Sequence, residues 1–424
     1  MWDFSTEPDF QEKLDWIERF MKEDVEPLET LGLDEAELAR VTAPLKQQVK
    51  DAGLWACHLG PELGGQGFGQ VKLGLMNELI GRSLIIGPPI FGNQAPDSGN
   101  AEILALFGTD EQKERWLWPL MDGKLRSCYS MTEPGAGSDP TLLTTRAERD
   151  GDGWVINGHK WFSSRANKAD FLIVMCVTDP EAKPLNRMSM FIVPRDTPGV
   201  NIVREVGVMV GEAHHAEVKY ENVRVPAEAL LGGEHQAFVM AQKRLGPGRI
   251  HHAMRWLGQC HRAFDMMCER ALTRFAHGSL LSEKQTVQNW IADSWTEMQA
   301  ARLLTLHAAW VIDQGGTSSE ARTEIAAIKF FGAKVLHDVI DRAIQVHGSI
   351  GVSTDLPLET MYKHARIARV VDGPDEVHRV TVARRVLKGY EPQEGLWPRE
   401  HIPTRREAAL AKFADVLEQS AADL

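Results

Sequence analysis

Two short segments of the chain combine residue types that could carry out catalysis. The first, TEPGAGSD at 132–139, places Gly135 and Gly137 beside hydroxyl side chains, so its backbone can approach a bulky polar ligand closely. The second, DGPDEVHR at 372–379, begins with the carboxylate of Asp372, which follows an apolar run and precedes a Gly-Pro turn. A carboxylate at the mouth of an apolar pocket is suited to removing a proton beside a carbonyl group, because desolvation raises its basicity. Together the two segments predict an enzyme.

The histidines do not follow a metal-binding pattern. Two adjacent pairs occur, His214–His215 and His251–His252, but neighbouring residues on a helix point about 100° apart and cannot share one ligand sphere. No HxxxH or HExxH spacing completes either pair. The chain also has no GxGxxG motif after a predicted strand, so a nicotinamide-binding site is not supported. We therefore expect no metal site.

The composition argues against several classes of protein. Of the 424 residues, 43% are hydrophobic and 25% are charged, which is ordinary for a soluble globular protein. A net charge of −12 argues against general affinity for nucleic acid or an anionic membrane. No apolar run approaches the roughly 20 residues of an integral membrane segment, and the start, MWDFSTEPDF, lacks the apolar stretch of a signal peptide. Five cysteines without CxxC spacing predict reduced thiols and a cytoplasmic location.

Changes in hydrophobic periodicity divide the chain. In residues 1–125 apolar residues recur mostly at helical spacing, which predicts an N-terminal helical domain. A Gly-rich connection at 61–70 interrupts this pattern, and residues 87–100 are loop by composition. In residues 126–235 short β-rich segments alternate with turn signals, which predicts a middle antiparallel β-domain. These β-rich segments are 154–156, 171–177, 188–193 and 215–225.

Helical periodicity returns in residues 236–390. The long amphipathic segments are 254–272, 282–314, 320–347 and 375–388. Each can bury its apolar stripe only by packing against the others, which predicts a C-terminal four-helix-bundle domain. The remaining tail, 391–424, contains prolines and then a helix candidate at about 405–422. The fold class expected from these patterns is mainly α with a central β-domain.

The two motifs and the order of the domains resemble the acyl-CoA dehydrogenases. These flavoenzymes introduce a double bond between the α and β carbons of acyl-CoA thioesters, and the resemblance extends to about residue 390. RLGPGRIHHAMRWLG at 244–258 and VDGPDEVH at 371–378 resemble the subgroup of longer-chain or branched-chain members that use an aspartate base. The resemblance implies FAD as cofactor, an acyl-CoA substrate and an electron-transfer flavoprotein as the electron acceptor.

The resemblance also implies residues that contact FAD and substrate within one chain. The flavin would be lined by CYSMTEPGAGSD and by INGHKWFSS at 156–164, in which an aromatic body and hydroxyl groups pack on the isoalloxazine. The implied FAD contacts are Tyr129, Met131, Thr132, Gly137, Ser138, Phe162, Ser163, Ser164 and Glu376. The implied substrate contacts are Ser138, Arg244, Asp372 and Gly373.

Two further segments are implied to contact FAD, and the first of them reaches the FAD of a neighbouring subunit. In ALTRFAHGSLLSEKQ at 271–285, Arg274 would clamp the pyrophosphate and Gln285 would reach the adenosine portion, while His277 stands where many members have phenylalanine. In QVHGSIG at 345–351, Gln345 and Gly348 match the family pattern, and Ser349 replaces its second glycine. The resemblance therefore implies a homodimer or homotetramer.

Asp372 is the expected catalytic base. It falls where many members carry a glutamate, and its side chain is shorter by one methylene, roughly 1.5 Å. The resemblance implies that Asp372 takes the α-proton while the β-hydride moves to flavin N5, which yields a trans-2-enoyl-CoA. The Asp372 backbone N–H and a flavin ribityl hydroxyl would meet the carbonyl oxygen. We expect Asp375 to cap the following helix and Glu133 to be structural.

Two other functions fit the same motifs. Nitroalkane oxidases resemble this family and also use an aspartate base, so a flavin oxidase is one alternative. A non-catalytic protein that binds acyl-CoA or FAD is another, because the usual glutamate is missing. Val371 stands where many straight-chain members carry tyrosine, and with the shorter Asp372 it predicts a medium-to-long or 2-methyl-branched acyl chain.

Overall fold

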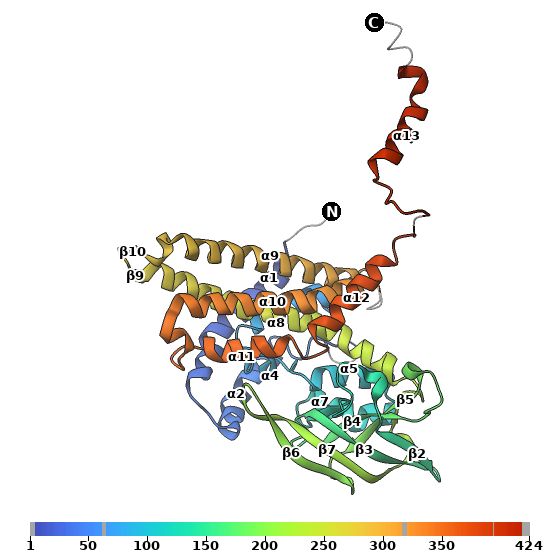
Figure 1. Ribbon diagram of the computed structural model, residues 1–424. Helices are drawn as coiled ribbons and strands as arrows, with labels where there is room; N and C mark the ends of the chain where they lie inside the picture. Colours follow the sequence, from blue (N-terminus) through green and yellow to red (C-terminus); the bar gives the residue numbers. More distant parts are fainter. Residues whose placement is uncertain (1–4, 62–64, 316–319, 393, 418–424) are drawn as a thin grey trace.

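The protein is mainly helical with one central sheet, as expected from the sequence (Figure 1). The computed structural model describes residues 5–61, 65–315, 320–392 and 394–417. In Figure 1 the long helices α8, α9 and α10 lie side by side, and the sheet lies below one end of them. The N-terminal helices are α1 (Pro8–Phe20), α2 (Glu35–Asp51), α3 (Gly69–Ile80), α4 (Gly87–Ile90), α5 (Asp97–Phe107), α6 (Asp110–Gln112) and α7 (Trp118–Met121).

Local signals explain where the N-terminal helices begin. Asp34 accepts a hydrogen bond from the Glu37 N–H and the Glu37 side chain accepts one from the Asp34 N–H, a capping box that starts α2. Residues 87–100 are loop by composition, but the family resemblance implies that part of the stretch is helical, and it contains α4 and the start of α5. Proline in a first turn is compatible with a helix because its missing N–H has no intrahelical partner there. In the connection 61–70, residues 62–64 lie outside the described residues.

The sheet is mostly antiparallel and follows the order β6-β7-β3-β2-β4-β5-β8. Two pairings depart from the antiparallel expectation, because β1 and β2 each pair in parallel with β4. All seven residues of β4 are buried, which explains its uninterrupted apolar sequence. The strands are β1 (Ser127–Ser130), β2 (Arg146–Asp150), β3 (Gly153–Ser164), β4 (Phe171–Val177), β5 (Met188–Pro194), β6 (Val200–Val208), β7 (Gly211–Val225) and β8 (Leu230–Leu231).

The C-terminal helices pack around α10, whose buried residues repeat along the helix. Helix α8 starts at Ala237, well before the predicted residue 254, and continues through Gly246-Pro247-Gly248. Its packing against α3, α5 and α10 outweighs the low helix propensity of that segment. The elements are α8 (Ala237–Thr273), β9 (Phe275–Ala276), β10 (Ser279–Leu280), α9 (Gln285–Asp313), α10 (Arg322–His347), α11 (Leu358–Ala368) and α12 (Asp375–Leu387).

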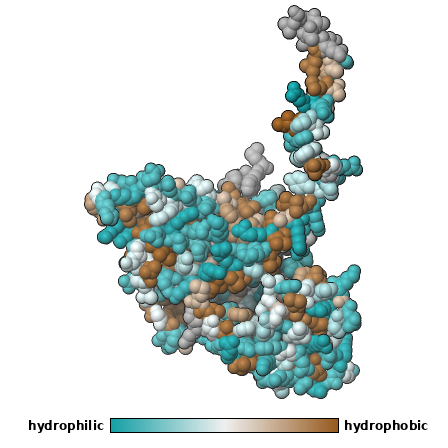
Figure 2. Space-filling view, in the orientation of Figure 1, coloured by the Kyte–Doolittle hydropathy of each residue, from teal (hydrophilic) through white to brown (hydrophobic). Residues whose placement is uncertain are grey.

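The tail leaves the body of the protein after α12 (Figure 1). Its helix, α13 (Ile402–Lys412), begins near the predicted residue 405, while residues 418–422 of that prediction lie outside the described residues. Figure 2 shows apolar side chains along this tail, and Ile402 and Leu410 are both exposed. In the described parts of the chain, no helix combines the length and apolar character needed to cross a membrane.

Candidate functional site

The loop between α11 and α12 holds Asp372 in one backbone conformation. Asp372 has a φ of 55°, in the left-handed region that non-glycine residues seldom adopt. Its carbonyl oxygen accepts hydrogen bonds from Arg249 Nη2 at 3.0 Å and from His378 Nε2 at 3.1 Å. Gly373 follows with a φ of 95°, and a Cβ there would lie 2.9 Å from His378 Nε2. The turn therefore requires glycine at 373 for His378 to hold the Asp372 carbonyl.

A second pair of contacts closes the same loop. Arg369 Nε donates to Asp375 Oδ2 at 2.8 Å, and the Asp375 N–H donates to the Arg369 carbonyl at 3.2 Å. Pro374 is the N-cap of α12, so the expectation that Asp375 caps this helix was wrong. Asp375 is instead buried in the first turn and paired with Arg369, because burial of its carboxylate demands a charged partner.

The surroundings of the Asp372 carboxylate are cationic rather than apolar. Val370 and Val371 are exposed, so the expected apolar pocket mouth is not formed by this run. Burial raises the pKa of Asp372, but the positive charges around it outweigh burial and leave that pKa below its ordinary value. The groups that lower it are, in decreasing order, His252, Arg249, Arg244 and Lys329. The expectation that desolvation makes Asp372 more basic was therefore wrong for the protein without bound ligand.

Lys329 lies beneath the loop between α11 and α12, which is called the base loop after the role expected for Asp372. It is buried on α10, and its Nζ donates to the Ala368 carbonyl at 2.8 Å, at the C-terminal end of α11. Burial lowers the pKa of Lys329 to about 8, and the carboxylates of Asp375 and Asp372 oppose that shift. A cation at a helix C-terminus stabilises the unpaired carbonyl groups there. Lys329 thus fixes the end of α11 from which the base loop departs.

His252 is the nearest titratable neighbour of the Asp372 carboxylate. Its Nε2 lies 3.7 Å from Asp372 Oδ2, and the two side chains are 28% and 29% exposed. Burial lowers the pKa of His252 to about 4, and the Asp372 carboxylate opposes that shift. The adjacent His251 points elsewhere, with Nε2 3.1 Å from Gln70 Oε1. The described residues include no cluster of histidine, cysteine, aspartate and glutamate that could hold a metal ion.

The two segments expected to line the flavin lie side by side. The Trp161 N–H donates to the Thr132 carbonyl at 2.8 Å, which joins β3 to the chain after β1. Phe162 is 44% exposed, and Ser164 Oγ lies 3.0 Å from His215 Nδ1. Ser163 faces the other way: it is buried, with its Oγ 2.9 Å from Ser130 Oγ. Phe162 and Ser164 are thus presented for contact, whereas Ser163 supports the strands behind them.

A buried ion pair anchors the Gly-rich loop to the sheet. Glu133 and Lys160 are 3% and 0% exposed, and Lys160 Nζ donates to Glu133 Oε1 at 2.9 Å. The Glu133 carboxylate also accepts from the Thr144 N–H, the Thr144 hydroxyl and the Thr145 N–H. Lys160 Nζ further donates to the Met131 carbonyl at 2.8 Å. These bonds give Glu133 a structural role and leave Gly137 and Ser138 exposed at the tip of the loop.

Arg244 lies between the segment that precedes the Gly-rich loop and Asp372, and its charge acts on the Asp372 carboxylate. Its guanidinium lies over the Tyr129 ring, 4.2 Å from the centroid, and its Nε donates to Asn100 Oδ1 at 3.0 Å. The Tyr129 hydroxyl is buried without a hydrogen-bond partner among the described residues. A buried unpaired hydroxyl is costly unless a ligand satisfies it. Tyr129, half-buried Met131 and Thr132, and the exposed loop tip therefore fit a polar aromatic cofactor such as a flavin.

A second group of predicted residues lies at the far end of the long helices. Arg274, Gln345 and Gly348 line one groove of about 400 Å³, in which Arg270 Nε is buried without a partner in the described chain. Exposed guanidinium and backbone groups in a groove suit a pyrophosphate. His277 forms the exposed turn between β9 and β10, where Lys284 Nζ donates to its carbonyl at 3.0 Å.

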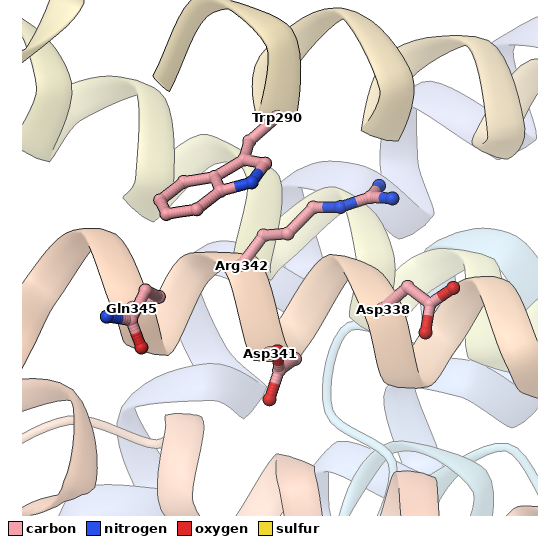
Figure 3. A pocket seen from close by; sticks show the side chains of 5 residues that line it. All are labelled: Trp290, Asp338, Asp341, Arg342 and Gln345. Atoms are coloured by element: carbon pink, nitrogen blue, oxygen red, sulfur yellow. The ribbon is translucent and has the colours of Figure 1, made fainter. Parts of the chain in front are cut away.

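A smaller pocket adjoins this groove through Gln345 (Figure 3). Trp290 of α9 lies over α10, and Arg342, Asp338 and Asp341 complete the lining of about 260 Å³. Arg342 Nη1 donates to Glu297 Oε2 at 2.8 Å, so its charge is already neutralised within the chain. Gln285, expected to reach the adenosine, is exposed at the first position of α9, at the same end of the molecule.

The residues expected to contact FAD form two groups that lie far apart in one chain. Arg244 and Arg274 lie at either end of α8, thirty residues apart, which corresponds to about 45 Å along a helix. The structure therefore joins Tyr129, Met131, Thr132, Phe162, Ser164, Arg244 and Asp372 in one region, while Arg274, His277, Gln285, Gln345 and Gly348 form another.

Three residues of the site were not singled out as such from the sequence, although Arg249 and His252 belong to the motif at 244–258. Arg249, His252 and Lys329 approach Asp372 from α8 and α10, far from it along the chain. Arg249 and His252 lie about one helical turn apart on α8. This spacing identifies them as neighbours of Asp372 only once the tertiary structure places the loop that carries Asp372 against that helix. Glu376 is exposed in the first turn of α12, four residues after Asp372, and its contact with a cofactor stays a prediction.

Comparisons with known proteins agree with this architecture. The profiles of the acyl-CoA dehydrogenase N-terminal, middle and C-terminal domains match residues 7–124, 128–223 and 237–387. The chain is 48% identical over 348 residues to a Mycobacterium tuberculosis protein named probable acyl-CoA dehydrogenase FadE2, covering 81% of this chain and 84% of that protein.

Two further matches extend over more of the chain. It is 41% identical over 396 residues to acyl-CoA dehydrogenase family member 11 of Rattus norvegicus, covering 89% of this chain but 50% of the relative, so the chain spans about half of that protein. The solved structure of a Mycobacterium abscessus protein assigned as an acyl-CoA dehydrogenase superposes with a TM-score of 0.85 at 39% identity. That match covers 92% of this chain and 100% of the other.

Proposed function

Since the chain belongs to the acyl-CoA dehydrogenase family, in which it is an FAD-dependent oxidoreductase, we propose that Asp372 is the base that removes the α-proton of an acyl-CoA thioester. The product would be a trans-2-enoyl-CoA. The observation that supports this role most directly is the fixed left-handed turn at Asp372, whose carbonyl is held by Arg249 and His378. Strained backbone held by surrounding contacts is common at catalytic positions, where it orients a reactive group before substrate binds.

The chain's own groups can prepare the substrate for proton loss. No described residue accepts a hydrogen bond from the Asp372 N–H, so this donor is available to a thioester carbonyl oxygen. A positioned donor stabilises the negative charge that develops on that oxygen as the α-proton leaves. Arg244 and Arg249 add positive potential near the same carboxylate. FAD, when bound, supplies the acceptor for the hydride of the β-carbon.

We propose that two copies of the chain complete each FAD site. One copy would offer Tyr129, Thr132, Phe162 and Ser164 to the flavin ring, and its neighbour would offer Arg274, Gln285, Gln345 and Gly348 to the pyrophosphate and adenosine. The support is the separation of these groups by the length of α8 together with the unpaired Arg270 Nε in the second groove. The assembly would be a homodimer or a homotetramer.

Replacing Arg274 with alanine should weaken FAD binding by about 10- to 100-fold, because a hydrogen bond to a charged phosphate contributes about 1.5–3 kcal/mol. Retention of FAD after gel filtration, measured by absorbance, tests this expectation, and light scattering reports the mass of the assembly. Arg19→Ala, at an exposed position of α1, is the matched control and should leave both unchanged. A monomer with full FAD occupancy would contradict the two-copy site.

The proposed substrate is a medium-to-long or 2-methyl-branched acyl-CoA. Its support is the short side chain of Asp372 and the presence of Val371 beside it, which leave room near the α-carbon. Each additional buried methylene contributes about 0.8 kcal/mol, so kcat/KM should rise by at most about fourfold per carbon and then level off. Anaerobic flavin bleaching against straight and 2-methyl-branched acyl-CoAs measures this directly.

The same assay separates the competing functions. An enzyme most efficient with butyryl-CoA, with values that fall steadily for longer chains, would refute the substrate proposal while leaving the reaction intact. Reduced flavin that reoxidises rapidly with O₂ would indicate an oxidase. A flavin that no acyl-CoA bleaches would indicate a binding protein and would overturn the proposed reaction.

We propose an electron-transfer flavoprotein as the electron acceptor and a reducing compartment such as the cytoplasm as the location. The acceptor follows from the family. The location is supported by the five cysteines, all of which are free and four of which are buried. Burial raises the pKa of Cys57 and Cys176 to about 12, which keeps both thiols protonated and unreactive.

A further inference from the structure

The tail that follows α12 carries an apolar stripe that the described chain leaves exposed. Ile402, Leu410, Phe413 and Leu417 are between 50% and 76% exposed. At about 100° per residue they fall within about 80° around α13 and its continuation. The Leu417 N–H donates to the Phe413 carbonyl, so helical hydrogen bonding extends to the end of this stripe. A stripe of this kind is the face that a helix normally buries against another surface.

The charge of the tail favours a protein partner over a lipid surface. A helix of about 15 residues is marginally stable in water by itself, so its apolar face needs cover. Residues 391–417 contain four basic and five acidic side chains, which nearly cancel. Attachment to an anionic membrane depends on basic residues clustered beside the apolar face. The tail offers no such excess of positive charge within its described residues.

Helix α9 presents an exposed apolar stripe of the same length. Trp295, Leu303 and Trp310 are between 39% and 56% exposed and fall within about 80° around the helix. The ends of this stripe are fifteen residues apart, about 22 Å along a helix, and so are Ile402 and Leu417 in the tail. Tryptophan is enriched where protein surfaces bind one another. In Figure 1, α9 lies along the upper edge of the body, and the tail rises beyond that edge.

We propose that the tail helix of one copy of the chain packs against α9 of a second copy, stripe against stripe. The tail points away from the body that carries it, and the α9 stripe of the same chain stays exposed (Figure 1). A second copy related by a two-fold axis would cover both stripes, and the contact would occur twice in each pair. The inference goes beyond the proposed function, because these side chains are not among those proposed to bind FAD or substrate.

The area of this contact is sufficient for a stable association. Each contact contains seven exposed apolar side chains, four from the tail and three from α9. A half-exposed large side chain loses on the order of 80–100 Å² when it is covered, so two contacts bury roughly 1,100–1,400 Å². Specific interfaces begin at about 1,000 Å². Arg406 lies within the tail stripe, where its aliphatic stem can pack while the guanidinium reaches water.

Photo-crosslinking of the full-length holoenzyme tests which surface the tail contacts. The photoreactive residue p-benzoylphenylalanine in place of Phe413 should give a covalent product of twice the chain mass on a denaturing gel. Mass spectrometry of the joined peptides should place the bond within α9, residues 285–313. The same photoreactive residue in place of Ala411, which lies on the opposite side of the tail helix, is the matched control and should give little of this product.

Phe413→Asp should raise the dissociation constant of the assembly by about 10- to 100-fold, because it removes an aromatic anchor and places a charge against the α9 stripe. Light scattering over a dilution series measures this change. Ala411→Asp introduces the same charge on the opposite side of the helix and should leave the dissociation constant unchanged.

Several results would overturn the proposal. A crosslinked product of single-chain mass would show that the tail covers its own body. A product that joins the tail to a second copy outside α9, or equal effects of Phe413→Asp and Ala411→Asp, would also contradict it. Sedimentation of the wild-type protein with phosphatidylglycerol vesicles, abolished by Phe413→Asp, would assign the stripe to a membrane instead.

Discussion

Asp372→Asn is expected to slow flavin reduction by about 10²- to 10⁴-fold, the contribution of a positioned general base. Asparagine preserves the size of the side chain and the hydrogen bonds that Arg249 and His378 make to the residue 372 carbonyl. It removes the group that accepts the α-proton. Stopped-flow measurement of flavin bleaching, with acyl-CoA binding followed separately through the flavin spectrum, gives the rate and the affinity. The affinity should change little.

The pH dependence of the wild-type enzyme follows from the cations around the base. They hold the pKa of Asp372 below the ordinary aspartate value of about 3.9, so the carboxylate is ionised throughout the neutral range. The acid limb of kcat/KM, which reports the free enzyme, should therefore lie below that value. An acid limb well above that value would contradict control of the Asp372 pKa by these cations.

Two companion variants control for the Asp372→Asn result. Asp372→Glu restores a carboxylate with one more methylene and should retain part of the activity, with an altered chain-length preference. Asp355→Asn, at an exposed position outside the loop that carries Asp372, should be fully active. Bleaching of Asp372→Asn at the wild-type rate would place the base elsewhere. Glu133 would be a poor substitute, because its carboxylate is buried and bonded to Thr144, Thr145 and Lys160.

Glu133→Ala is expected to reduce the free energy of unfolding by about 3–5 kcal/mol, because it leaves the Lys160 ammonium buried without its counterion. The midpoint of thermal unfolding should fall, and FAD should be lost because the Gly-rich loop loses its anchor on the sheet. Glu148→Ala, at an exposed position of β2, is the matched control and should change stability by no more than about 0.5 kcal/mol. An unchanged midpoint in Glu133→Ala would contradict the anchoring role.

The effect of acid on this pair has a definite sign. Burial raises the pKa of Glu133, but Lys160 and the Thr144 and Thr145 donors outweigh it and lower that pKa to about 2. A carboxyl group whose pKa is lower in the folded protein than in the unfolded chain stabilises the fold above the unfolded value, about 4.3, and this contribution is lost as pH falls toward 2. The difference in midpoint between wild type and Glu133→Ala should therefore narrow between pH 5 and pH 2.

The sequence by itself determined the order and type of the main elements. The apolar run 171–177 specified a strand buried on both faces, and the stripe in 320–347 specified the helix that became α10. Such patterns can be recognised in a short stretch of sequence, because the apolar residues that face the core recur with the period of the helix or strand. The motifs at 132–139 and 372–379 likewise located the Gly-rich loop and the loop of the proposed base, because glycine and proline mark turns and places where the backbone can approach a ligand closely.

The tertiary structure decided what surrounds those motifs. The run before Asp372 predicted an apolar pocket mouth, but helix packing placed Arg249, His252 and Lys329 there instead. Helix α8 continues through a Gly-Pro-Gly segment that local propensity would end, because α3, α5 and α10 bury it. Ser163 and Ser164 are adjacent in sequence, yet strand alternation turned one into the sheet and the other outward. Charge and solvation at a site depend on residues distant in the chain, and only packing brings those residues together.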